Sequence, residues 1–307
     1  IASKNVGSNK TVSIGTLALA DGSNGGLAAN YTLSGGTHQL TVNQRPLNAT
    51  LARQYDASTT ATGSTLSSLD ALQGGENLTM TGSGTAVSAN VASGIAMASN
   101  GDLALADGTG GSAGLASNYS LNSTVINITQ RVLNSSGSKT YDANTNAIAS
   151  AITLLNLAGG ETLTHTGTAA TSSANAGSYT ISNLSGISIA DGTGSASNYT
   201  LTGGTHNFTI DQRVIGVSGT RLYDATTNAT ASDLSTHSNL VGSQTVVLSG
   251  TGTIASKNVG SNKTVSIGTL ALADGSNGGL AANYALSGGT HNLTINTRPL
   301  NVSGTRQ

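Results

Sequence analysis

The feature that most restricts the fold of this chain is an internal repeat. Residues 1–31 recur without change at residues 254–284, and a looser match continues to residue 54 against residue 307. The offset between the two copies is 253 residues. Self-similarity of this kind indicates an array of structural units, each built from the same pattern of secondary structure.

Short motifs divide this offset into related units. Tyr-Asp-Ala begins at Tyr55, Tyr141 and Tyr223, so its spacings are 86 and 82 residues. Three other features recur at similar spacings: Asn-Tyr at Tyr31, Tyr119, Tyr199 and Tyr284; Ala-Asp-Gly at Asp21, Asp107, Asp191 and Asp274; and an opening arginine at Arg45, Arg131, Arg213 and Arg298.

The motifs predict modules at residues 45–130, 131–212 and 213–297. Residues 1–44 are then expected to be the C-terminal half of a preceding module, and residues 298–307 the start of a following one. The natural chain is accordingly expected to be longer at both ends.

Composition limits the cores and the partners. The chain has no cysteine or tryptophan and one phenylalanine, so we expect small cores of Leu, Ile, Val and Tyr without disulfides or thiolate metal sites. A net charge of −1, with 12 scattered Lys and Arg, argues against nucleic acid as a partner. No apolar run approaches the roughly 18 residues that span a membrane, so no membrane insertion is expected.

Alternating apolar residues predict strands after each opening arginine, as at Ile215 and Val217, and around Leu78 and Met80. Tyr31 begins the closing strand. This pattern gives about five strands per module and predicts an all-β fold of tandem small β-sandwich or β-grasp-like modules in an elongated rod. The alternative is a β-solenoid, although no short coil period is visible.

Two local patterns lead to further expectations. Apolar residues three apart, at Leu66, Leu69 and Leu72 and again at Leu234, His237 and Leu240, predict one helical or 3₁₀ turn. The alternation of Val12 and Ile14 slips by one residue before Leu17 and Leu19, which predicts a β-bulge at Gly15-Thr16.

Histidines are the first candidates for chemistry. His38, His206 and His291 occupy one repeat position, whose fourth copy we align with Ile126. His165 aligns with Met80 and Leu248, and His237 with Leu69 and Leu155. A histidine that exchanges with aliphatic residues is better explained by packing than by metal binding, so no metal site is predicted.

The repeated carboxylates also have simple structural explanations. The Asp21 loop offers one carboxylate, whereas calcium requires six to eight oxygens, so a tight turn is expected. Tyr55, Tyr141 and Tyr223 are expected to supply core area with a hydrated hydroxyl, and Asp56, Asp142 and Asp224 to close Asx turns. No catalytic residue, cofactor site or phosphate-binding loop is predicted, and the chain is not expected to be an enzyme.

Asn-x-Ser/Thr sequons make N-glycosylation possible, although chance sequons are common in a chain so rich in these residues. They include Asn9, Asn30, Asn48, Asn77, Asn118, Asn198, Asn207, Asn228, Asn262, Asn292 and Asn301.

The opening arginine, the Tyr-Asp-Ala and the closing Asn-Tyr-x-Leu resemble the YDG and MBG repeats of large bacterial surface exoproteins. In the third module these are Arg213-Val214-Ile215, Tyr223-Asp224-Ala225 and Asn283-Tyr284-Ala285-Leu286. Ala57, Ala143 and Ala225 stand where the family name implies glycine. The resemblance implies a filamentous-haemagglutinin-like adhesin, exported by two-partner secretion, in which such repeats form the stalk.

These observations predict a structural stalk of an extracellular adhesin at the bacterial cell surface, supporting adhesion or a biofilm matrix. Its expected partners are a host or matrix surface, or like chains. Two alternatives remain open: a repeated carbohydrate- or protein-binding module, and the subunit of a self-assembling extracellular filament.

Overall fold

The computed structural model describes residues 1–181 and 183–306, and within them the predicted all-β class is confirmed. The helices there are 3₁₀ turns of three residues: η1 (Ala28–Asn30), η2 (Gly63–Thr65), η3 (Gly110–Ser112), η4 (Ala116–Asn118), η5 (Ala149–Ala151), η6 (Ala196–Asn198), η7 (Ala231–Asp233) and η8 (Ala281–Asn283). None of the helices in these residues has the length and apolarity to cross a membrane.

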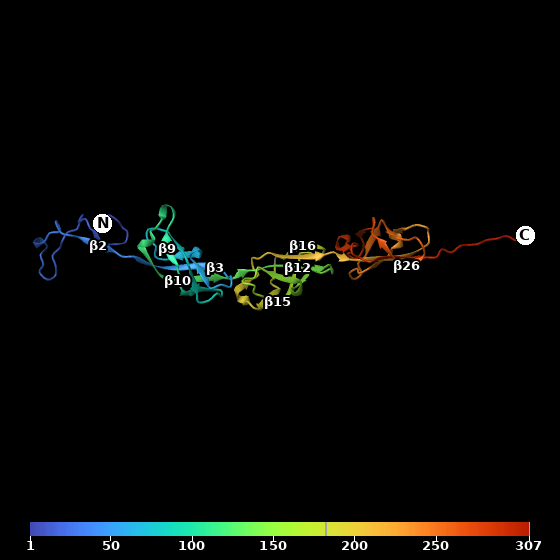
Figure 1. The fold of residues 1–307 in the computed structure, drawn as a ribbon, viewed down its shortest axis with the longest axis horizontal. Helices are drawn as coiled ribbons and strands as arrows, with labels where there is room; N and C mark the ends of the chain where they lie inside the picture. Colours follow the sequence, from blue (N-terminus) through green and yellow to red (C-terminus); the bar gives the residue numbers. More distant parts are fainter. Residues whose placement is uncertain (182, 307) are drawn as a thin grey trace. The chain divides into compact units, whose positions relative to one another are not determined.

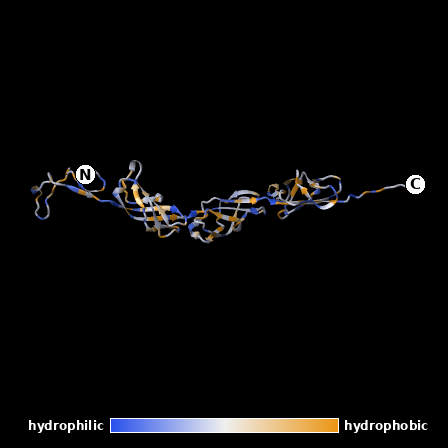
Figure 2. Ribbon diagram, viewed as in Figure 1, coloured by the Kyte–Doolittle hydropathy of each residue, from blue (hydrophilic) through white to orange (hydrophobic). Residues whose placement is uncertain are grey.

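The chain divides into two compact units. The first contains Ile1–Arg131, Ala158–Gly160 and Ser197–Tyr199, and the second contains Val132–Leu157, Glu161–Ala196 and the chain from Thr200 on. Strands dominate both units (Figure 1), and hydrophobic residues concentrate on these strands (Figure 2).

The first unit is built on a six-stranded sheet that curls into a half-barrel, in the order β4-β7-β8-β10-β3-β5. Its strands are β3 (Arg45–Gln54), β4 (Thr60–Thr62), β5 (Leu66–Leu69), β7 (Ser83–Ala86), β8 (Ala92–Ser99) and β10 (Tyr119–Thr129). The first and last strands, β3 and β10, pair in parallel, and the other pairs are antiparallel. Because successive strand residues face opposite sides, Leu47, Ala49 and Leu51 all enter the core.

A second, smaller sheet covers this core. The strands β6 (Leu78–Thr81) and β9 (Ala104–Asp107) pair antiparallel, which confirms the strand predicted around Leu78 and Met80. Leu47, Leu78 and Tyr119 form one buried cluster.

The chain forms eight strands between residues 45 and 129, whereas about five were expected. The surplus arises because the chain alternates between the two sheets, and each change requires a turn. At the turn between β6 and β7, Gly82 has φ +78°, and a Cβ there would lie 2.2 Å from the carbonyl oxygen of Asp102. Only glycine fits such a close backbone approach.

The expected 3₁₀ turn is present as η2, directly before Leu66, but its predicted position over Leu66 and Leu69 is wrong, because both residues lie on β5. Leu66 pairs with Leu51 and Leu69 with Ala49, with a register shift between them. A β-bulge of this kind lets residues three apart face residues two apart on the neighbouring strand. His237 likewise lies on a strand, β23 (Thr236–Ser238), just after η7.

In the second unit, residues 134–211 form two sheets in the orders β14-β12-β19-β16 and β13-β15-β17. Their strands are β12 (Asn134–Thr140), β13 (Asn146–Ile148), β14 (Ile152–Leu155), β15 (Leu163–Ala170), β16 (Gly177–Thr180), β17 (Ile187–Asp191) and β19 (His206–Asp211). Again the first and last strands, β12 and β19, pair in parallel. Two short strands, β11 (Arg131–Val132) before this region and β18 (Tyr199–Thr200) between β17 and β19, form a further two-stranded sheet.

Residues 213–296 repeat the pattern with the sheet β22-β25-β26-β29-β21-β23 and the pairs β24-β27 and β20-β28. The strands are β20 (Arg213–Val214), β21 (Gly216–Leu222), β22 (Asn228–Thr230), β24 (Val246–Ser249), β25 (Thr251–Ile254), β26 (Gly260–Ser266), β27 (Ala271–Asp274), β28 (Tyr284–Ala285) and β29 (His291–Asn296). Here β21 and β29 are the parallel pair.

Residues 1–44 contain two paired strands, β1 (Gly7–Thr11) and β2 (Gln39–Val42), followed directly by β3. The β-bulge expected at Gly15-Thr16 is wrong, because these residues form a turn in which the Leu17 N–H donates to the Ile14 carbonyl at 2.9 Å. In the second copy, the equivalent turn at Gly268 carries the chain from β26 to β27 in a different sheet. The alternation slips because the chain changes sheet.

Candidate functional site at the repeat junctions

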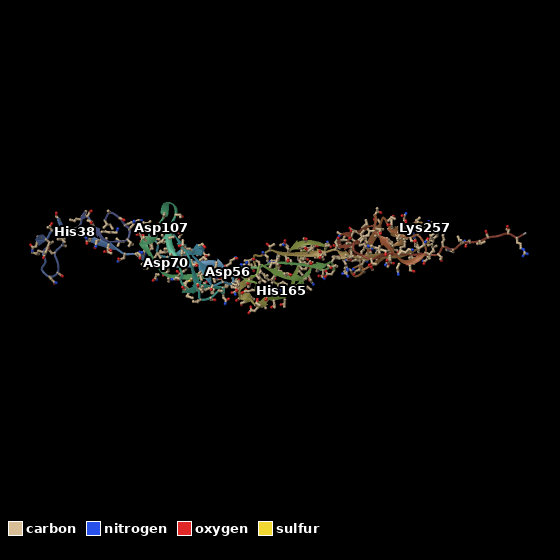
Figure 3. The ribbon with its side chains drawn as sticks, viewed as in Figure 1. His38, Asp56, Asp70, Asp107, His165 and Lys257 are labelled. Carbon is tan, nitrogen blue, oxygen red and sulfur yellow. The ribbon has the colours of Figure 1, made fainter. Side chains whose placement is uncertain are left out.

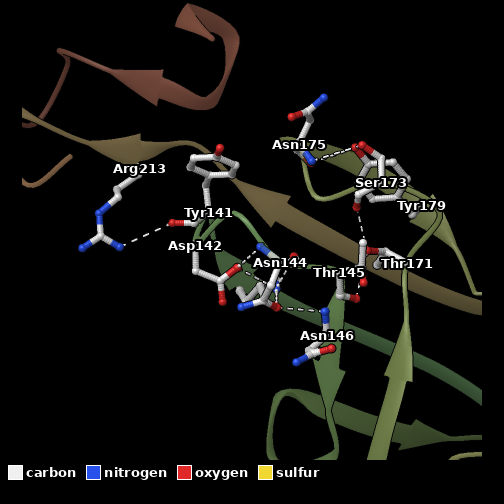
Figure 4. Close-up of polar contacts among 11 residues, drawn as sticks. Tyr141, Asp142, Asn144, Thr145, Asn146, Thr171, Ser173, Asn175, Tyr179 and Arg213 are labelled. Atoms are coloured by element: carbon white, nitrogen blue, oxygen red, sulfur yellow. Dashed lines mark hydrogen bonds and ion pairs between the residues drawn. The ribbon is translucent and has the colours of Figure 1, made fainter. Parts of the chain in front are cut away.

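Each Tyr-Asp-Ala motif forms a tight turn after a first strand. The aspartate Oδ1 accepts a hydrogen bond from the backbone N–H two residues later, which is the expected Asx turn. The distances are 2.9 Å from Ser58 to Asp56, 3.1 Å from Asn144 to Asp142, and 3.0 Å from Thr226 to Asp224. Figure 4 shows this turn around Asp142.

The alanine of each motif adopts a left-handed backbone conformation. The φ angles of Ala57, Ala143 and Ala225 are 64°, 62° and 65°. This conformation costs an L-residue roughly 1–2 kcal/mol, whereas glycine adopts it freely. The turn therefore has a physical requirement for glycine at the position where this chain carries alanine.

A basic side chain three residues before each aspartate holds the turn, and the sequence predictions missed it. Lys139 lies 2.8 Å from Asp142, Arg221 lies 2.8 Å from Asp224, and Arg53 contacts Asp56. The Thr226 N–H, with lesser help from Arg221, holds the pKa of Asp224 below its ordinary value. The available signal was a Lys or Arg at one repeat position in all three copies.

The tyrosines of successive motifs meet in pairs. The rings of Tyr55 and Tyr199 pack edge to face at 5.3 Å in the first unit, and those of Tyr141 and Tyr284 at 5.5 Å in the second. These four side chains are buried, and the pairing joins a Tyr-Asp turn to the Asn-Tyr motif of the following module. Of the other predicted signature residues, Tyr119 is buried, Tyr223 is half-buried and Tyr31 is exposed.

The hydroxyls of Tyr141, Tyr284 and Tyr119 make hydrogen bonds to side chains. In the second unit, Gln244 Oε1 accepts a hydrogen bond from Tyr284 at 2.5 Å, and Gln244 Nε2 donates to the Tyr141 oxygen at 3.0 Å. Burial raises the pKa of Tyr284. In the first unit, the Tyr119 hydroxyl donates to Glu76 at 2.7 Å.

The asparagines of three of the four Asn-Tyr motifs, Asn118, Asn198 and Asn283, also bind a loop that precedes their own module. Asn198 Oδ1 accepts from the Val91 N–H at 2.9 Å, and its Nδ2 donates to Asn90 at 3.0 Å. Asn283 makes the same pair of bonds to the Ala176 N–H and to Asn175, at 2.8 and 3.1 Å. Asn118 repeats the arrangement with Val6 and Asn5.

The Ala-Asp-Gly aspartates position these asparagines. Asp107 Oδ1 accepts a hydrogen bond from the first backbone N–H of η4 at 2.7 Å, and Asp274 does the same for η8. Each 3₁₀ turn ends at the asparagine. The aspartates therefore close their loops by binding the first N–H of the 3₁₀ turn, whereas only a tight turn was expected from the sequence.

One histidine alignment is wrong by two residues. His206 pairs with Ser135 and His291 with Val217, but the residue at that register in the first unit is Thr124, not Ile126. The misalignment arose because the segment between Tyr119 and Thr124, which lies within β10, is two residues shorter than its counterparts and lacks the Gly-Gly-Thr that precedes the histidines elsewhere. His291 Nε2 lies 2.9 Å from the Leu286 carbonyl oxygen, which closes this loop.

The remaining histidines also contact backbone or core. His165 Nε2 lies within 3.0 Å of the Ala149 and Ile152 carbonyl oxygens. His237 pairs with Val217 as Leu69 does with Ala49, but in residues 134–155 the equivalent pairing residue is Leu154, one before the predicted Leu155.

Within residues 1–181 and 183–306, no group of three or more His, Asp or Glu side chains gathers to hold a metal ion. Asp56, Asp70 and Asp107 lie at separate points of the first unit (Figure 3). Among the sequons, Asn198 is 1% exposed and its Nδ2 is committed to Asn90, so a glycan at that atom is incompatible with the junction.

Comparison with known proteins identifies the family of the repeats. The family model described as the YDG domain matches residues 127–206 and 210–292, which together make up more than half of the chain. Searches of curated proteins and of solved structures gave no significant match. The chain, with its repeated Tyr-Asp turns, belongs to the YDG domain family.

Proposed function

We propose that this chain is part of the structural stalk of an extracellular bacterial adhesin, which carries load and performs no catalysis. Its partners would be a host or matrix surface. The YDG repeats, the low charge and the repeated junction contacts support this proposal.

The observation that carries it is the parallel pairing of the first and last strands in every complete repeat. β3 and β10 pair over residues 45–54 and 119–129, with one register shift between Leu121 and Ser123, and β12–β19 and β21–β29 repeat the parallel arrangement. In a parallel pair, the chain enters at one end of the sheet and leaves at the other. Tension between the ends must therefore shear the whole ladder at once instead of opening it bond by bond.

The connection between successive repeats is also short. β19 ends at Asp211 and β20 begins at Arg213, and the Tyr141 N–H donates to the Asp211 carbonyl at 2.9 Å. The Arg213 guanidinium donates to the Tyr141 carbonyl at 3.4 Å (Figure 4). A pulling force would pass from one ladder to the next through this short connection.

Single-molecule pulling of the full chain by its ends tests the proposal. We expect the repeat at residues 213–297 to unfold at a high, discrete force, and Thr220→Pro on β21 to lower that force. Leu248→Ala on β24 is the control, because it weakens the fold without touching the parallel ladder. Extension at low force, or equal effects of the two variants at matched thermal stability, would contradict a load-bearing role. So would a compact globule in small-angle scattering.

A further inference from the structure

A row of four polar side chains crosses the outward face of one sheet in the repeat built from β12 to β19. This sheet contains β12 and β16 (Figure 1) and has the order β14-β12-β19-β16. Ser136 pairs with Thr153 on one side and with Asn207 on the other, and Asn207 pairs with Thr180. All four residues are exposed, because the alternate residues of these strands, such as Phe208, face the core.

The following repeat carries the same row on the sheet that contains β21 and β29. Ser218 pairs with Thr236 and with Asn292, and Asn292 pairs with Thr264. Read across the sheets, both rows have the residue types Thr, Ser, Asn and Thr. We call them the neutral rows, since each offers three hydroxyls and one amide without a charge.

The hydrogen-bonding groups of the neutral rows are not used inside the protein. Among the residues that the structure describes, these eight hydroxyls and amides have no hydrogen-bond partner. The junction asparagines differ, because Asn198 and Asn283 are committed to Asn90 and Asn175. Hydroxyls and amides each contain a donor and an acceptor, so the neutral rows are free to bind a ligand that offers both.

We propose that the neutral rows bind a neutral polysaccharide. Sugar hydroxyls donate and accept hydrogen bonds, as the side chains of the rows do. Charge complementarity selects an uncharged polymer, because no position in either row provides a counter-charge for an acidic or basic one. The next outward residues along the strands, Ser138 paired with Thr209 and Thr220 paired with Thr294, are neutral as well.

Repetition compensates for weak individual sites. Neither row contains an aromatic ring, so stacking on sugar rings does not contribute and each row alone should bind weakly. A polymer with many equivalent sugars can occupy two rows of one chain, and the second contact then forms at a high effective concentration. This inference goes beyond the load-bearing role, which the pulling experiment tests without any ligand.

The first complete repeat provides a natural comparison. Its residues at the same register are Ser68, Thr50, Val125 and Ala96, which pair in that order. This row lacks the amide and one of the three hydroxyls. We therefore expect the repeat at residues 45–130 to bind the polymer less well than the other two repeats.

Removal of the amides tests the proposal on the full chain. Dextran and galactomannan, both neutral, and alginate, which is acidic, are immobilised, and binding is measured by biolayer interferometry. We expect binding to at least one neutral polymer and little to alginate. Asn207→Val/Asn292→Val, which copies the natural Val125, should weaken binding roughly 10-fold or more, since each row loses a donor and an acceptor.

A matched control makes the same change outside the rows. Asn146→Val/Asn228→Val alters the exposed first residues of β13 and β22 and should leave the affinity unchanged. Equal losses in the two double variants would overturn the assignment of the site. Binding to neither neutral polymer, or equally strong binding to alginate, would overturn the proposal itself.

Construction of a third row gives the converse test. Val125→Asn/Ala96→Thr installs the missing amide and hydroxyl in the first complete repeat and should raise the affinity several-fold through the added contact. A gain of this kind cannot arise from misfolding. An unchanged affinity, or sedimentation showing that the rows bind a second copy of the chain instead of the polymer, would overturn the proposal.

Discussion

Two regions of this protein have the same sequence, but their side chains are buried to different extents. Residues 1–31 and 254–284 are identical, and each is followed by a closely similar final strand. Both copies pair in the same antiparallel register: Gly7 lies opposite Val42, as Gly260 lies opposite Ile295. Both also form the capped 3₁₀ turn before Asn-Tyr.

Burial separates the two copies. Tyr31 is 69% exposed, whereas Tyr284 is 2% exposed, and Leu17 is 62% exposed where Leu270 is 6% exposed. The second copy packs against residues 213–253, which supply β21, β24 and β25 as neighbours. The pairing of β1 with β2 thus forms without the first half of the module, whereas core formation requires that half.

The largest difference should come from tyrosine removal. Tyr284→Ala deletes a buried ring packed edge to face against Tyr141 and should cost the 213–297 repeat about 3–5 kcal/mol. Tyr31→Ala should change stability by less than about 0.5 kcal/mol. Hydrogen exchange read by mass spectrometry on residues 32–42 and 285–295, which differ in sequence, reports each copy separately. Equal changes in hydrogen exchange in the two variants would contradict the difference in burial between the two copies.

The junction asparagine should give the next largest effect. Asn283→Ala leaves the Ala176 N–H and Asn175 without their partner and should destabilise the repeat by about 1–3 kcal/mol. Asn30 is the matched control, since its side chain is exposed in the identical sequence. Urea titration followed by exchange in the same two peptides measures both. A large loss from Asn30→Ala would show that the motif acts locally.

Relieving backbone strain should produce a smaller gain. Ala225→Gly removes a left-handed alanine and should stabilise the 213–297 repeat by about 0.5–1 kcal/mol, after the greater unfolded entropy of glycine is counted. Ala229→Gly on β22 should destabilise it instead, because that alanine is fully buried in a strand. Thermal unfolding distinguishes the signs, and residues 1–44 should not respond to either change.

The smallest effect should depend on pH. Burial lowers the pKa of His237 from its ordinary value of 6.5, so the folded state favours the neutral ring. The unfolded chain then binds more protons below pH 6.5, and stability should be lost as the pH falls until the folded pKa is passed. His237→Leu should remove this contribution to the pH dependence of exchange in residues 285–295. If the stability of His237→Leu depended on pH as steeply as that of the unsubstituted chain, His237 would not be the source of the effect.

The strands and Asx turns could be predicted because they depend on neighbouring residues. Alternation located the strand at Leu78 and Met80, and the Tyr-Asp sequence located its turn. Contacts distant in sequence could not be predicted in this way. The spacing of Leu66 and Leu69 looks helical in a single sequence, and only the pairing with β3 shows a bulged strand.

The junction site was predictable only in part. The tyrosines and aspartates stood out as motifs, but their pairing across modules, such as Tyr141 with Tyr284, joins residues more than 140 positions apart. The bridging Gln244 carries no local pattern that marks it. Thr124 could be aligned with the histidines only from the register of β10 on β3, because the segment between Tyr119 and Thr124 differs from that in the other copies.

By itself, the sequence determined the repeat and the Asx turns, because both depend on residues that are close together in the chain. The pairing of β1 with β2, which joins Gly7 to Val42, is seen only in the structure. Tertiary structure decided which side chains become core. In residues 1–44 the counterparts of β27 and β28 are not strands, since the partners that β24 and β20 provide are absent there. Burial requires surfaces from both halves of a module, so identical residues are exposed in residues 1–31 and buried in residues 254–284.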